Sequence, residues 1–436
     1  MPENRVATGP MGLARWLDEL EHRHAQTIQL GLERVQAVLE RLAVQGSARV
    51  ITVGGTNGKG SVCAFLEAIY SAAGYRVGCY SSPHFLRFNE RVRINGQEVS
   101  DAELADALDA VERARQQTPL TYFEHTTLAA WHIFCARQLE VVILEVGLGG
   151  RLDAVNVFEP DCAVVTSVDI DHQAWLGETR EQIGFEKAGI FRKHKPAVCS
   201  DSHPPQSLLN YVQEIEAHLY LQGWDFGFQG DRQQWLFWFK MAESHIQRRG
   251  GLVLPALRGK HQLGNAASAL MVLELLREVL PISMQAVRTG LSGIRLAGRF
   301  QSVPGRPVVV LDVAHNEAAA RVLSDNLLDM GFFPQTWAVC GMLADKAVEA
   351  VAAQLKDRID CWLVVPLPGE RAIPVDALAQ RLRDGGAKQV MCLDSPAEAL
   401  NYAKKNLGQD DRIVVFGSFL TVAAVCAAEN ISTQAV

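Results

Sequence analysis

The sequence lacks several features that would place it in a special class of protein. No apolar run approaches the roughly 20 residues that a transmembrane helix needs, and Met1 to Pro10 hold no apolar core of a secretory signal. The nine cysteines are scattered, without a Cys-x-x-Cys pair, a pattern typical of reduced thiols. We therefore expect a cytoplasmic protein with no membrane-spanning segment and no disulfide framework.

The composition is that of an ordinary globular protein. Hydrophobic residues make up 48% of the 436 residues and charged residues 21%, which argues against disorder and collagen-like repeats. The length suggests two or three domains. The formal net charge of −7 and the pI of about 6.0 argue against general nucleic-acid binding.

A βαβ unit is predicted near the N-terminus. The β-branched run Val50 to Val53 ends at a glycine pair, the amphipathic stretch Val62 to Ala73 follows, and Arg76 to Tyr80 is the next strand candidate. Two helical stretches, Leu13 to Leu20 and Thr27 to Leu42, precede this unit.

Continuous apolar runs predict further strands, of the kind found in parallel sheets covered on both faces. In the second half of the chain these runs alternate with Ala- and Leu-rich helical stretches, which predicts a smaller doubly wound α/β domain. A cluster of Gly and Pro in Arg295 to Pro307 marks the boundary. Asp231 to Lys240, rich in Trp and Phe, is a candidate for a β-hairpin or for added strands. The strand candidates are Val141 to Val146, Cys162 to Val168, Val308 to Val313, Trp337 to Gly341, Cys361 to Pro366, Gln389 to Leu393 and Arg412 to Gly417.

A glycine-rich loop, Gly55 to Ser61, joins the first strand candidate to a helix. Such a loop turns backbone N–H groups toward phosphate oxygens, and Lys59 can neutralise the phosphates while the hydroxyl of Ser61 can bind Mg²⁺. The segment departs from the standard Walker pattern, because Gly60 separates Lys59 from Ser61. The alternative interpretation is a glycine-rich turn with a surface lysine.

Polar residues follow three strand candidates of this first part. Glu145 ends one strand and suits a Mg²⁺ ligand, although a solvated strand-end acid is the alternative. Asp171-His172 follows the next strand, where the histidine is either structural or an unusual Mg²⁺ ligand. Ser81-Ser82 ends Arg76 to Tyr80. Because ligands gather at the carboxyl ends of parallel strands, we expect these residues to converge on the phosphate loop.

Asp312-Val313-Ala314-His315-Asn316 ends a strand of the second block. It is either a polar rim that faces the first domain or a helix N-cap formed by Asp312 or Asn316. Both interpretations fit the spacing.

Taken in order, these motifs resemble the folylpolyglutamate synthase family, which is related to the Mur ligases. Each piece alone is weak, but the ordered set spans nearly the whole chain. Within the family the chain is most similar to the bacterial bifunctional branch. The matching segments are Gly54 to Ser61, Tyr80 to Phe85, Thr121 to Glu124, Glu145 to Asn156, Asp171 to Gly177, Glu186 to Arg192, Gly298 to Gln301 and Asp312 to Asn316.

The resemblance implies an α/β fold with two domains and the active site between them. Residues 1–296 would form an N-terminal Mur-ligase-like P-loop ATPase domain with a parallel sheet, and residues 297–436 a smaller C-terminal Rossmann-like α/β domain. By the same resemblance, ATP would lie on Thr56, Asn57, Gly58, Lys59, Asn265, Arg299 and Asp312; Mg²⁺ on Ser61, Ser82, Glu145 and His172; and the pterin substrate on Leu30, Gly31, Thr121, Tyr122, Phe123, Glu124, Leu152, Asp153 and Ala154.

The implied activity is ATP-dependent amide formation. Phosphoryl transfer to a carboxylate would give an acyl phosphate that the amine of L-glutamate attacks, with dihydropteroate and reduced folates as carboxylate substrates. Lys59, Lys187 and His315 are the implied catalytic residues. Lys187 matches a lysine that is carbamylated in relatives, whereas an ordinary helix lysine paired with an acid is the alternative. We expect a monomer without nucleic-acid or membrane partners.

Two other functions stay open at the level of the sequence: a Mur-type peptide ligase and a non-catalytic nucleotide-binding switch. The Thr121 to Glu124 segment favours the folate branch. Thr27 to Arg34 is similar to a pterin-contacting segment of the bifunctional relatives, although its periodicity favours the start of a surface helix. The chain departs from the family pattern at Gln173, Ala174 and Val155, which affects the second metal site and a substrate hydrogen bond.

Overall fold

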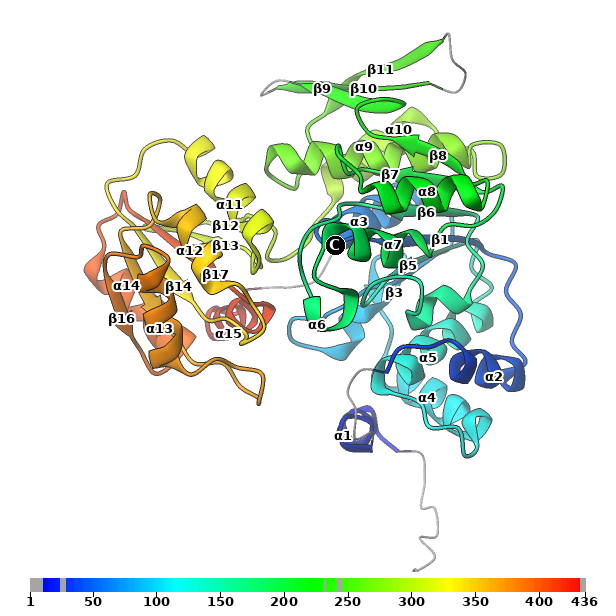
Figure 1. The fold of residues 1–436 in the computed structure, drawn as a ribbon, viewed down its shortest axis with the longest axis horizontal. Helices are drawn as coiled ribbons and strands as arrows, with labels where there is room; N and C mark the ends of the chain where they lie inside the picture. Colours follow the sequence, from blue (N-terminus) through cyan, green and yellow to red (C-terminus); the bar gives the residue numbers. More distant parts are fainter. Residues whose placement is uncertain (1–10, 24–28, 231–232, 241–244, 432–436) are drawn as a thin grey trace, which may run out of the picture.

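The computed structural model describes residues 11–23, 29–230, 233–240 and 245–431 (Figure 1). Two lobes lie side by side in Figure 1. The N-terminal lobe contains the elements from α1 (Leu13–Arg23) to α10 (Met284–Gly293), and the C-terminal lobe those from β12 (Gln301–Val303) to α15 (Phe419–Glu429). Within the described residues, no helix is both long and apolar enough to cross a membrane.

The main sheet of the N-terminal lobe has eight strands among the described residues. The six strands from β2 to β8 in its spatial order are parallel, and two antiparallel strands extend one edge. In spatial order the strands are β4 (Gln97–Glu98), β3 (Val92–Ile94), β2 (Val77–Tyr80), β5 (Val141–Glu145), β1 (Arg49–Gly54), β6 (Cys162–Val165), β7 (Pro196–Cys199) and β8 (His218–Leu221).

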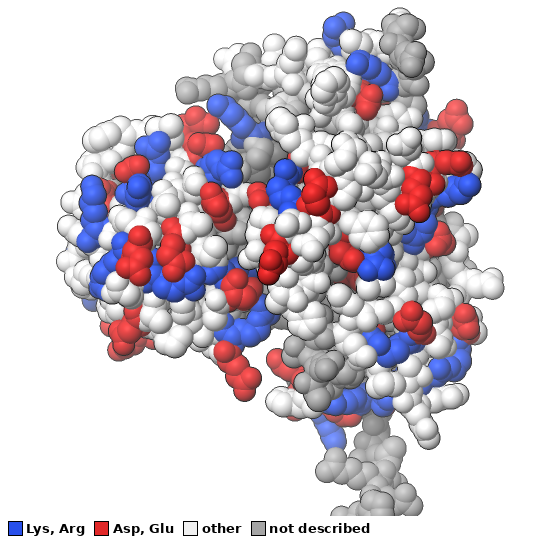
Figure 2. All heavy atoms as spheres, in the orientation of Figure 1, with Lys and Arg blue, Asp and Glu red and all other residues white. Residues whose placement is uncertain are grey.

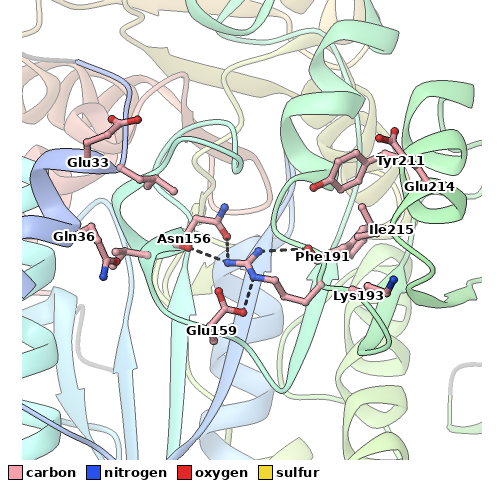
Figure 3. A pocket seen from close by; sticks show the side chains of 12 residues that line it. Glu33, Gln36, Asn156, Glu159, Phe191, Lys193, Tyr211, Glu214 and Ile215 are labelled. Atoms are coloured by element: carbon pink, nitrogen blue, oxygen red, sulfur yellow. Dashed lines mark hydrogen bonds and ion pairs between the residues drawn. The ribbon is translucent and has the colours of Figure 1, made fainter. Parts of the chain in front are cut away.

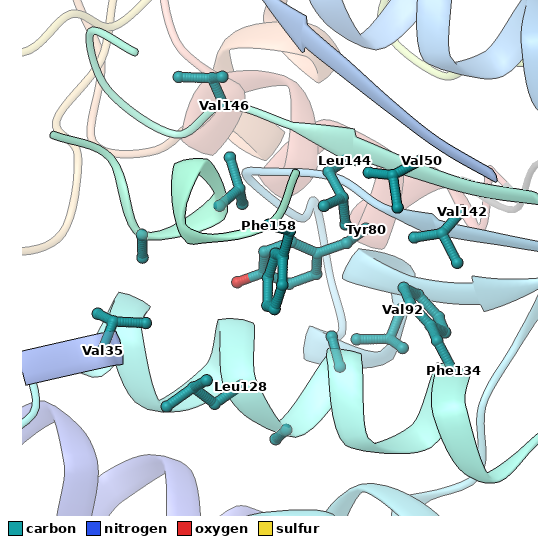
Figure 4. Close-up of a cluster of buried hydrophobic side chains, with 14 of the residues drawn as sticks. Val35, Val50, Tyr80, Val92, Leu128, Phe134, Val142, Leu144, Val146 and Phe158 are labelled. Atoms are coloured by element: carbon teal, nitrogen blue, oxygen red, sulfur yellow. The ribbon is translucent and has the colours of Figure 1, made fainter. Parts of the chain in front are cut away.

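Both faces of this sheet are buried. Successive side chains of each strand point to opposite faces, so each strand contributes to two hydrophobic clusters. In β1, Val50 packs into one hydrophobic cluster and Ile51 and Val53 into the other. Figure 4 shows the first cluster, in which Leu128 and Phe134 of a helix pack beneath strand residues. Its helices are α1, α2 (Glu33–Leu42), α4 (Asp101–Arg115), α5 (Tyr122–Ala136), α7 (Arg180–Ala188) and α8 (Gln206–Glu214).

The opposite face is covered by α3 (Lys59–Ala72), α9 (Lys260–Leu275) and α10. A small antiparallel sheet packs on the same cluster through Trp235, Phe237 and Phe239, which alternate along its middle strand. The predicted hairpin over Asp231 to Lys240 is instead a single strand, Gln234–Lys240, whose two partner strands lie on either side of that range, so the alternative of added strands is the one confirmed. The strands are β9 (Phe226–Gly230), β10 (Gln234–Lys240) and β11 (Ile246–Val253).

The C-terminal lobe is a doubly wound α/β unit, as predicted. Five parallel strands and an antiparallel edge strand, counted over the described residues, separate two hydrophobic clusters. The strands are β12, β13 (Val308–Leu311), β17 (Arg412–Phe416), β14 (Thr336–Cys340), β15 (Cys361–Val364) and β16 (Val390–Cys392) in spatial order, and the helices are α11 (Glu317–Asp329), α12 (Val348–Leu355), α13 (Val375–Asp384), α14 (Pro396–Asn406) and α15.

Two predicted elements are shorter than expected, for local reasons. The helix predicted over Thr27 to Leu42 begins only at Glu33, because Gly31 has a φ of 139°, which is not helical; Thr27 and Ile28 lie outside the described residues. The strand predicted over Cys162 to Val168 ends at Val165, where the chain turns to hold the glycine-rich loop: the Thr166 hydroxyl donates to the carbonyls of Gly54 and Asn57. On the face seen in Figure 2, acidic and basic side chains are interspersed over both lobes.

Candidate active site

The phosphate-binding loop candidate connects β1 to α3 and depends on two glycines. Gly55 has a φ of 138°, and a Cβ there would lie 1.9 Å from Thr166 Oγ1. Gly58, with a φ of 92°, is the N-cap of α3, and its Cβ would lie 2.7 Å from Asn265 Oδ1. Both positions therefore require glycine, and the loop brings Asn265 of α9 against the helix N-terminus.

Residues after β6 hold this loop in place. Thr56 donates its backbone N–H to the carbonyl of Ser167 (2.8 Å), and the N–H of Asn57 donates to the Ser167 hydroxyl (3.0 Å). Lys59 Nζ donates to the carbonyls of Gly55 (3.0 Å) and Thr56 (3.2 Å). The lysine thus lies over its own loop, at the N-terminus of α3, where phosphate oxygens bind in such folds.

Glu145 and Ser82, from neighbouring strands, meet beside the loop. The backbone N–H of Ser82 donates to Glu145 Oε2 at 3.2 Å, and both Glu145 oxygens lie within 3.8 Å of the position of a Cβ on Gly60. Burial raises the pKa of Glu145, although Lys59 and Arg299 favour its charged form. Ser61 lies in the first turn of α3 and is also buried.

Lys187 is a buried amine in the last turn of α7. Its exposed fraction is 4%, and no hydrogen bond or ion pair to its ammonium occurs among the described residues. Burial and the charge of Lys59 lower its pKa to about 7, while Asp171 and Asp153 oppose this shift. The alternative of a helix lysine paired with an acid does not describe this arrangement.

The segment just before β12 places Arg299 against the same loop. An Arg299 Nη lies 3.7 Å from the Cβ position on Gly60, and its guanidinium stacks 5.1 Å from the ring centroid of Phe419. Asp312 accepts the backbone N–H groups of Phe300 and Ala314, both at 2.8 Å. Burial raises the pKa of Asp312, partly offset by these bonds and Arg299.

Asp171 joins the two lobes, which sequence reasoning did not anticipate. It accepts a hydrogen bond from Lys346 Nζ at 2.6 Å and from Asn316 Nδ2 at 3.2 Å, and His315 Nε2 lies 3.5 Å away. Burial acts to raise the pKa of Asp171, but His315, Lys346 and His172 outweigh it and hold that pKa far below its ordinary value. Asn316 also exchanges side-chain hydrogen bonds with Asn57.

Asn316 is indeed the N-cap of α11, accepting from Ala319 N–H, so the cap interpretation of the second motif was correct for this residue. His315 Nδ1 contacts the carbonyl of Val313 at 2.8 Å. Cap and interlobe roles therefore coexist in one motif.

His172 has a left-handed backbone (φ 53°) at the N-cap of α6 (Gln173–Leu176). Burial lowers its pKa to about 4, so the neutral imidazole is available as a ligand. Its ring nitrogen, with carboxylate oxygens of Asp171 and Asp345, lies in a group compact enough for a metal ion. Lys346 already neutralises both carboxylates, at 2.6 and 3.3 Å, so we disfavour this trio as the metal site.

Residues matching the family's pterin segment lie around the start of α5, away from the phosphate loop in sequence. Thr121 and Glu124 form a capping box (Thr121 N–H to Glu124 Oε2, 2.7 Å), and Arg34 donates to Glu124 at 2.6 Å. Gly31 donates to the carbonyl of Leu152 at 3.4 Å. These contacts bring the segments with Leu30, Tyr122, Phe123 and Ala154 together.

Asp153 has a clear local role: it caps the 3₁₀ helix η2 (Ala154–Val157) by accepting the N–H of Val155 at 3.1 Å. Burial raises its pKa to about 6. Val155 is fully buried, whereas Gln173 and Ala174 are exposed.

A cavity of about 780 Å³ lies elsewhere, at the amino ends of β6 and β7 (Figure 3). Arg192 lines it, and its guanidinium donates to Glu159 (2.8 Å) and to the backbone and side-chain oxygens of Asn156. Because catalytic groups gather at the carboxyl ends of these strands, this cavity is not the candidate site.

A phosphate loop facing a second α/β lobe defines the class of Mur-type ligases, and comparison with known proteins agrees. The family described as Mur ligase middle domain matches residues 53–273, and the Mur ligase glutamate ligase domain matches residues 298–419. The chain is 43% identical, over 95% of its length and 94% of the relative, to the dihydrofolate synthase/folylpolyglutamate synthase of Escherichia coli (strain K12).

Solved structures give the same result. The E. coli protein FolC in complex with DHPP and ADP matches with a TM-score of 0.90 and 42% identity, covering 96% of this chain and 98% of that one. A bifunctional folylpolyglutamate synthase/dihydrofolate synthase with Mn, AMPPNP and L-glutamate bound matches with a TM-score of 0.89 and 43% identity, covering 97% and 98%. This chain belongs to the dihydrofolate synthase/folylpolyglutamate synthase family.

Proposed function

We propose that this chain is an ATP-dependent amide ligase that adds L-glutamate to dihydropteroate, giving dihydrofolate, and to reduced folates, giving polyglutamylated products. The observation that carries the proposal is the meeting of Lys59, Glu145 and Arg299 at the N-terminus of α3. This arrangement suits phosphoryl transfer, and family membership supports the choice of substrates.

ATP phosphates bind the loop Thr56 to Lys59, with Asn265, Arg299 and Asp312 holding the rest of the nucleotide. Two facts support this assignment. Asn265 and Arg299 both approach glycines of the loop, and the N-terminal N–H groups of α3 have no intrahelical partner. Lys59 leaves the loop carbonyls to contact the β and γ phosphates.

A divalent cation, Mg²⁺, is held by Ser61, Ser82, Glu145 and His172. The residues fit the ion because Glu145 is buried with one backbone hydrogen bond and no ion pair among the described residues, and His172 is neutral. The cation would offset charge on the transferring phosphoryl group. Ala174 stands in place of the family's acid, which leaves Asp171 as the carboxylate beside His172.

Lys187 carries a carbamate in the working enzyme. The neutral amine adds CO₂, forming an N–C bond and releasing one proton, so that a neutral group becomes an anion near Lys59. The support is a buried, unpaired amine whose pKa is lowered to about 7. A carbamate there removes the repulsion between two lysines.

In the reaction, the substrate carboxylate attacks the γ-phosphorus and ADP leaves, giving an acyl phosphate. The amine of L-glutamate then attacks the acyl carbon and forms the amide bond. The bond between the acyl carbon and the phosphate oxygen breaks, phosphate leaves, and the amine nitrogen loses one proton. Lys59 and Arg299 stabilise the phosphoryl oxygens. His315 contacts the carbonyl of Val313 and the carboxylate of Asp171, and so lies at the interface between the lobes. Closure of the lobes at this interface excludes water from the acyl phosphate.

The carboxylate substrate lies along Leu30, Gly31, Thr121 to Glu124 and Leu152 to Ala154. The contacts between these segments support one continuous surface. We further propose the domain division 1–296 and 297–436, which falls between α10 and β12. A cytoplasmic monomer without nucleic-acid partners stays a prediction.

Product analysis tests the proposal. Purified protein with ATP, Mg²⁺ and L-glutamate should convert both dihydropteroate and tetrahydrofolate to the amide, with one ADP and one phosphate per bond by mass spectrometry and phosphate assay. ATP binding without an amide product would support the nucleotide switch instead. Extension of folates without use of dihydropteroate would restrict the chain to polyglutamylation.

A further inference from the structure

Arg91 lies between two parts of the proposed site. Its backbone carbonyl accepts the N–H of Ser81 at 2.9 Å, one residue from the proposed metal ligand Ser82. Its guanidinium carbon lies 5.5 Å from the ring centroid of Phe88 and 5.8 Å from that of Tyr122. Arg91 therefore bridges the loop after β2 and the proposed substrate segment at the start of α5.

The guanidinium of Arg91 has hydrogen-bond donors that are not used within the described part of the protein. Arg91 Nε donates to His84 Nδ1 at 2.9 Å, and because arginine only donates, that nitrogen is an acceptor. Over the residues that the structure describes, neither terminal nitrogen of Arg91 has a protein acceptor, and no carboxylate pairs with it.

Neighbouring arginines differ in this respect. Arg87 pairs with Asp101 at 3.0 Å, and Arg93 pairs with Glu67 at 2.7 Å. The guanidinium of Arg91 is positioned by the rings of Phe88 and Tyr122 and by its hydrogen bond to His84, and its two terminal nitrogens remain available for a ligand. Such a fork binds a carboxylate through two parallel hydrogen bonds.

The two acceptor substrates differ in their carboxylates. Dihydropteroate has one, which must reach the phosphate loop to react. The terminal glutamate of a folate has two: the γ-carboxylate reacts, and the α-carboxylate needs a partner a few ångströms away. Building on the proposed function, we propose that Arg91 binds the α-carboxylate of the terminal glutamate of folate substrates and so acts in folate extension but not in dihydrofolate formation.

The decisive probe is tetrahydropteroyl-4-aminobutyrate, which keeps the reacting carboxylate and lacks only the α-carboxylate. The wild-type protein should use tetrahydrofolate about 10-fold better in kcat/KM than this analogue, as expected for a charge-assisted hydrogen-bonded pair. Arg91→Gln retains a planar group for stacking but no charge. It should lose the preference to within about 2-fold, while kcat/KM for dihydropteroate stays within about 2-fold of wild type.

Arg87→Gln on the same loop is the matched control, since Arg87 is paired at the surface, and it should keep the wild-type preference. Equal losses with all three acceptors in Arg91→Gln would make Arg91 a structural residue and overturn the proposal. A raised KM for L-glutamate with every acceptor would assign Arg91 to the incoming amino acid and overturn it as well.

Equal use of tetrahydrofolate and the analogue by the wild type would also overturn it, and this comparison does not depend on the variant folding. The dihydropteroate reaction reports the proposed function separately. A wild type that forms no amide from any acceptor would refute the proposed function, whereas amide formation without discrimination would refute only the role of Arg91.

Discussion

Lys346→Met should impair catalysis much more than it impairs folding. Lys346 in the C-terminal lobe and Asp171 in the N-terminal lobe are 7% and 9% exposed, with Nζ and Oδ1 2.6 Å apart. Removing one partner of a buried pair typically costs about 3–5 kcal/mol, because the other charge stays buried and unpaired. Asp171 keeps Asn316 and His315 as neighbours, so we expect a cost somewhat below this range, about 2–3 kcal/mol.

The lost free energy weakens the contact between the lobes, because Lys346 and Asp171 belong to different lobes. A loss of 2–3 kcal/mol corresponds to roughly a 30- to 150-fold decrease in kcat/KM. Each lobe retains its own core, so the melting temperature of the protein should fall by only a few degrees.

The assay is steady-state ligation with tetrahydrofolate, ATP and L-glutamate, combined with a double-mutant cycle using Asp171→Asn. Lys404→Met is the matched control: its ion pair with Glu429 is also 2.6 Å long but lies within one lobe, with exposures of 34% and 30%, where about 0–1 kcal/mol is expected. A coupling energy near zero between Asp171 and Lys346, or equal effects of Lys346→Met and Lys404→Met, would refute the reasoning.

Three further predictions concern the proposed site. Lys59→Ala should lower ligation by at least about 100-fold in a protein whose circular dichroism is unchanged; near-normal turnover would remove the phosphate-loop assignment. Glu145→Gln should raise the Mg²⁺ concentration needed for half-maximal activity by about 10-fold or more, because an amide is a poor ligand for a hard cation; an unchanged requirement would leave Glu145 a strand-end acid. With CO₂ excluded, Lys187→Met should stabilise the protein more at pH 7 than at pH 9.5. The pKa of Lys187 in the folded protein, about 7, lies below its pKa in the unfolded chain, so the wild type gains stability as pH rises from 7 to 9.5. A difference in unfolding free energy between wild type and variant that does not change with pH, measured by chemical denaturation, would contradict this. NMR with ¹³CO₂ would detect the carbamate directly.

Elements with an unbroken apolar pattern could be predicted from the sequence alone. The strand runs beginning at Val141 and Cys361 start at those residues in the structure as well, because strands buried on both faces need no polar alternation. The β3–β4 hairpin was missed. Its Arg93 looks like a surface residue in the sequence, but it is buried and pairs with Glu67, which lies 26 positions away.

The site could be predicted where a short motif contains it, or where the ends of parallel strands bring separate motifs together, as for Ser82 and Glu145. Gly55, Gly58 and Lys59 are close together in the sequence, and their position at the N-terminus of a predicted helix indicates phosphate binding. Asp171 and Lys346 are separated by 175 positions, and no local pattern links them. The run Asp345-Lys346 was the available signal, but a charged pair in a loop is ordinarily solvated.

The buried charges of the candidate site share one property that connects its geometry to ligand binding. Burial raises the pKa of Glu145 and Asp312 and lowers that of Arg299, and over the described residues none of the three forms an ion pair. Each charge therefore costs folding free energy in the protein alone. A nucleotide with a divalent cation would supply the missing partners at once, which would stabilise the folded state in proportion to its affinity. Since Glu145 comes from one lobe and Arg299 and Asp312 from the other, we predict that nucleotide binding and closure of the lobes are linked through these three residues.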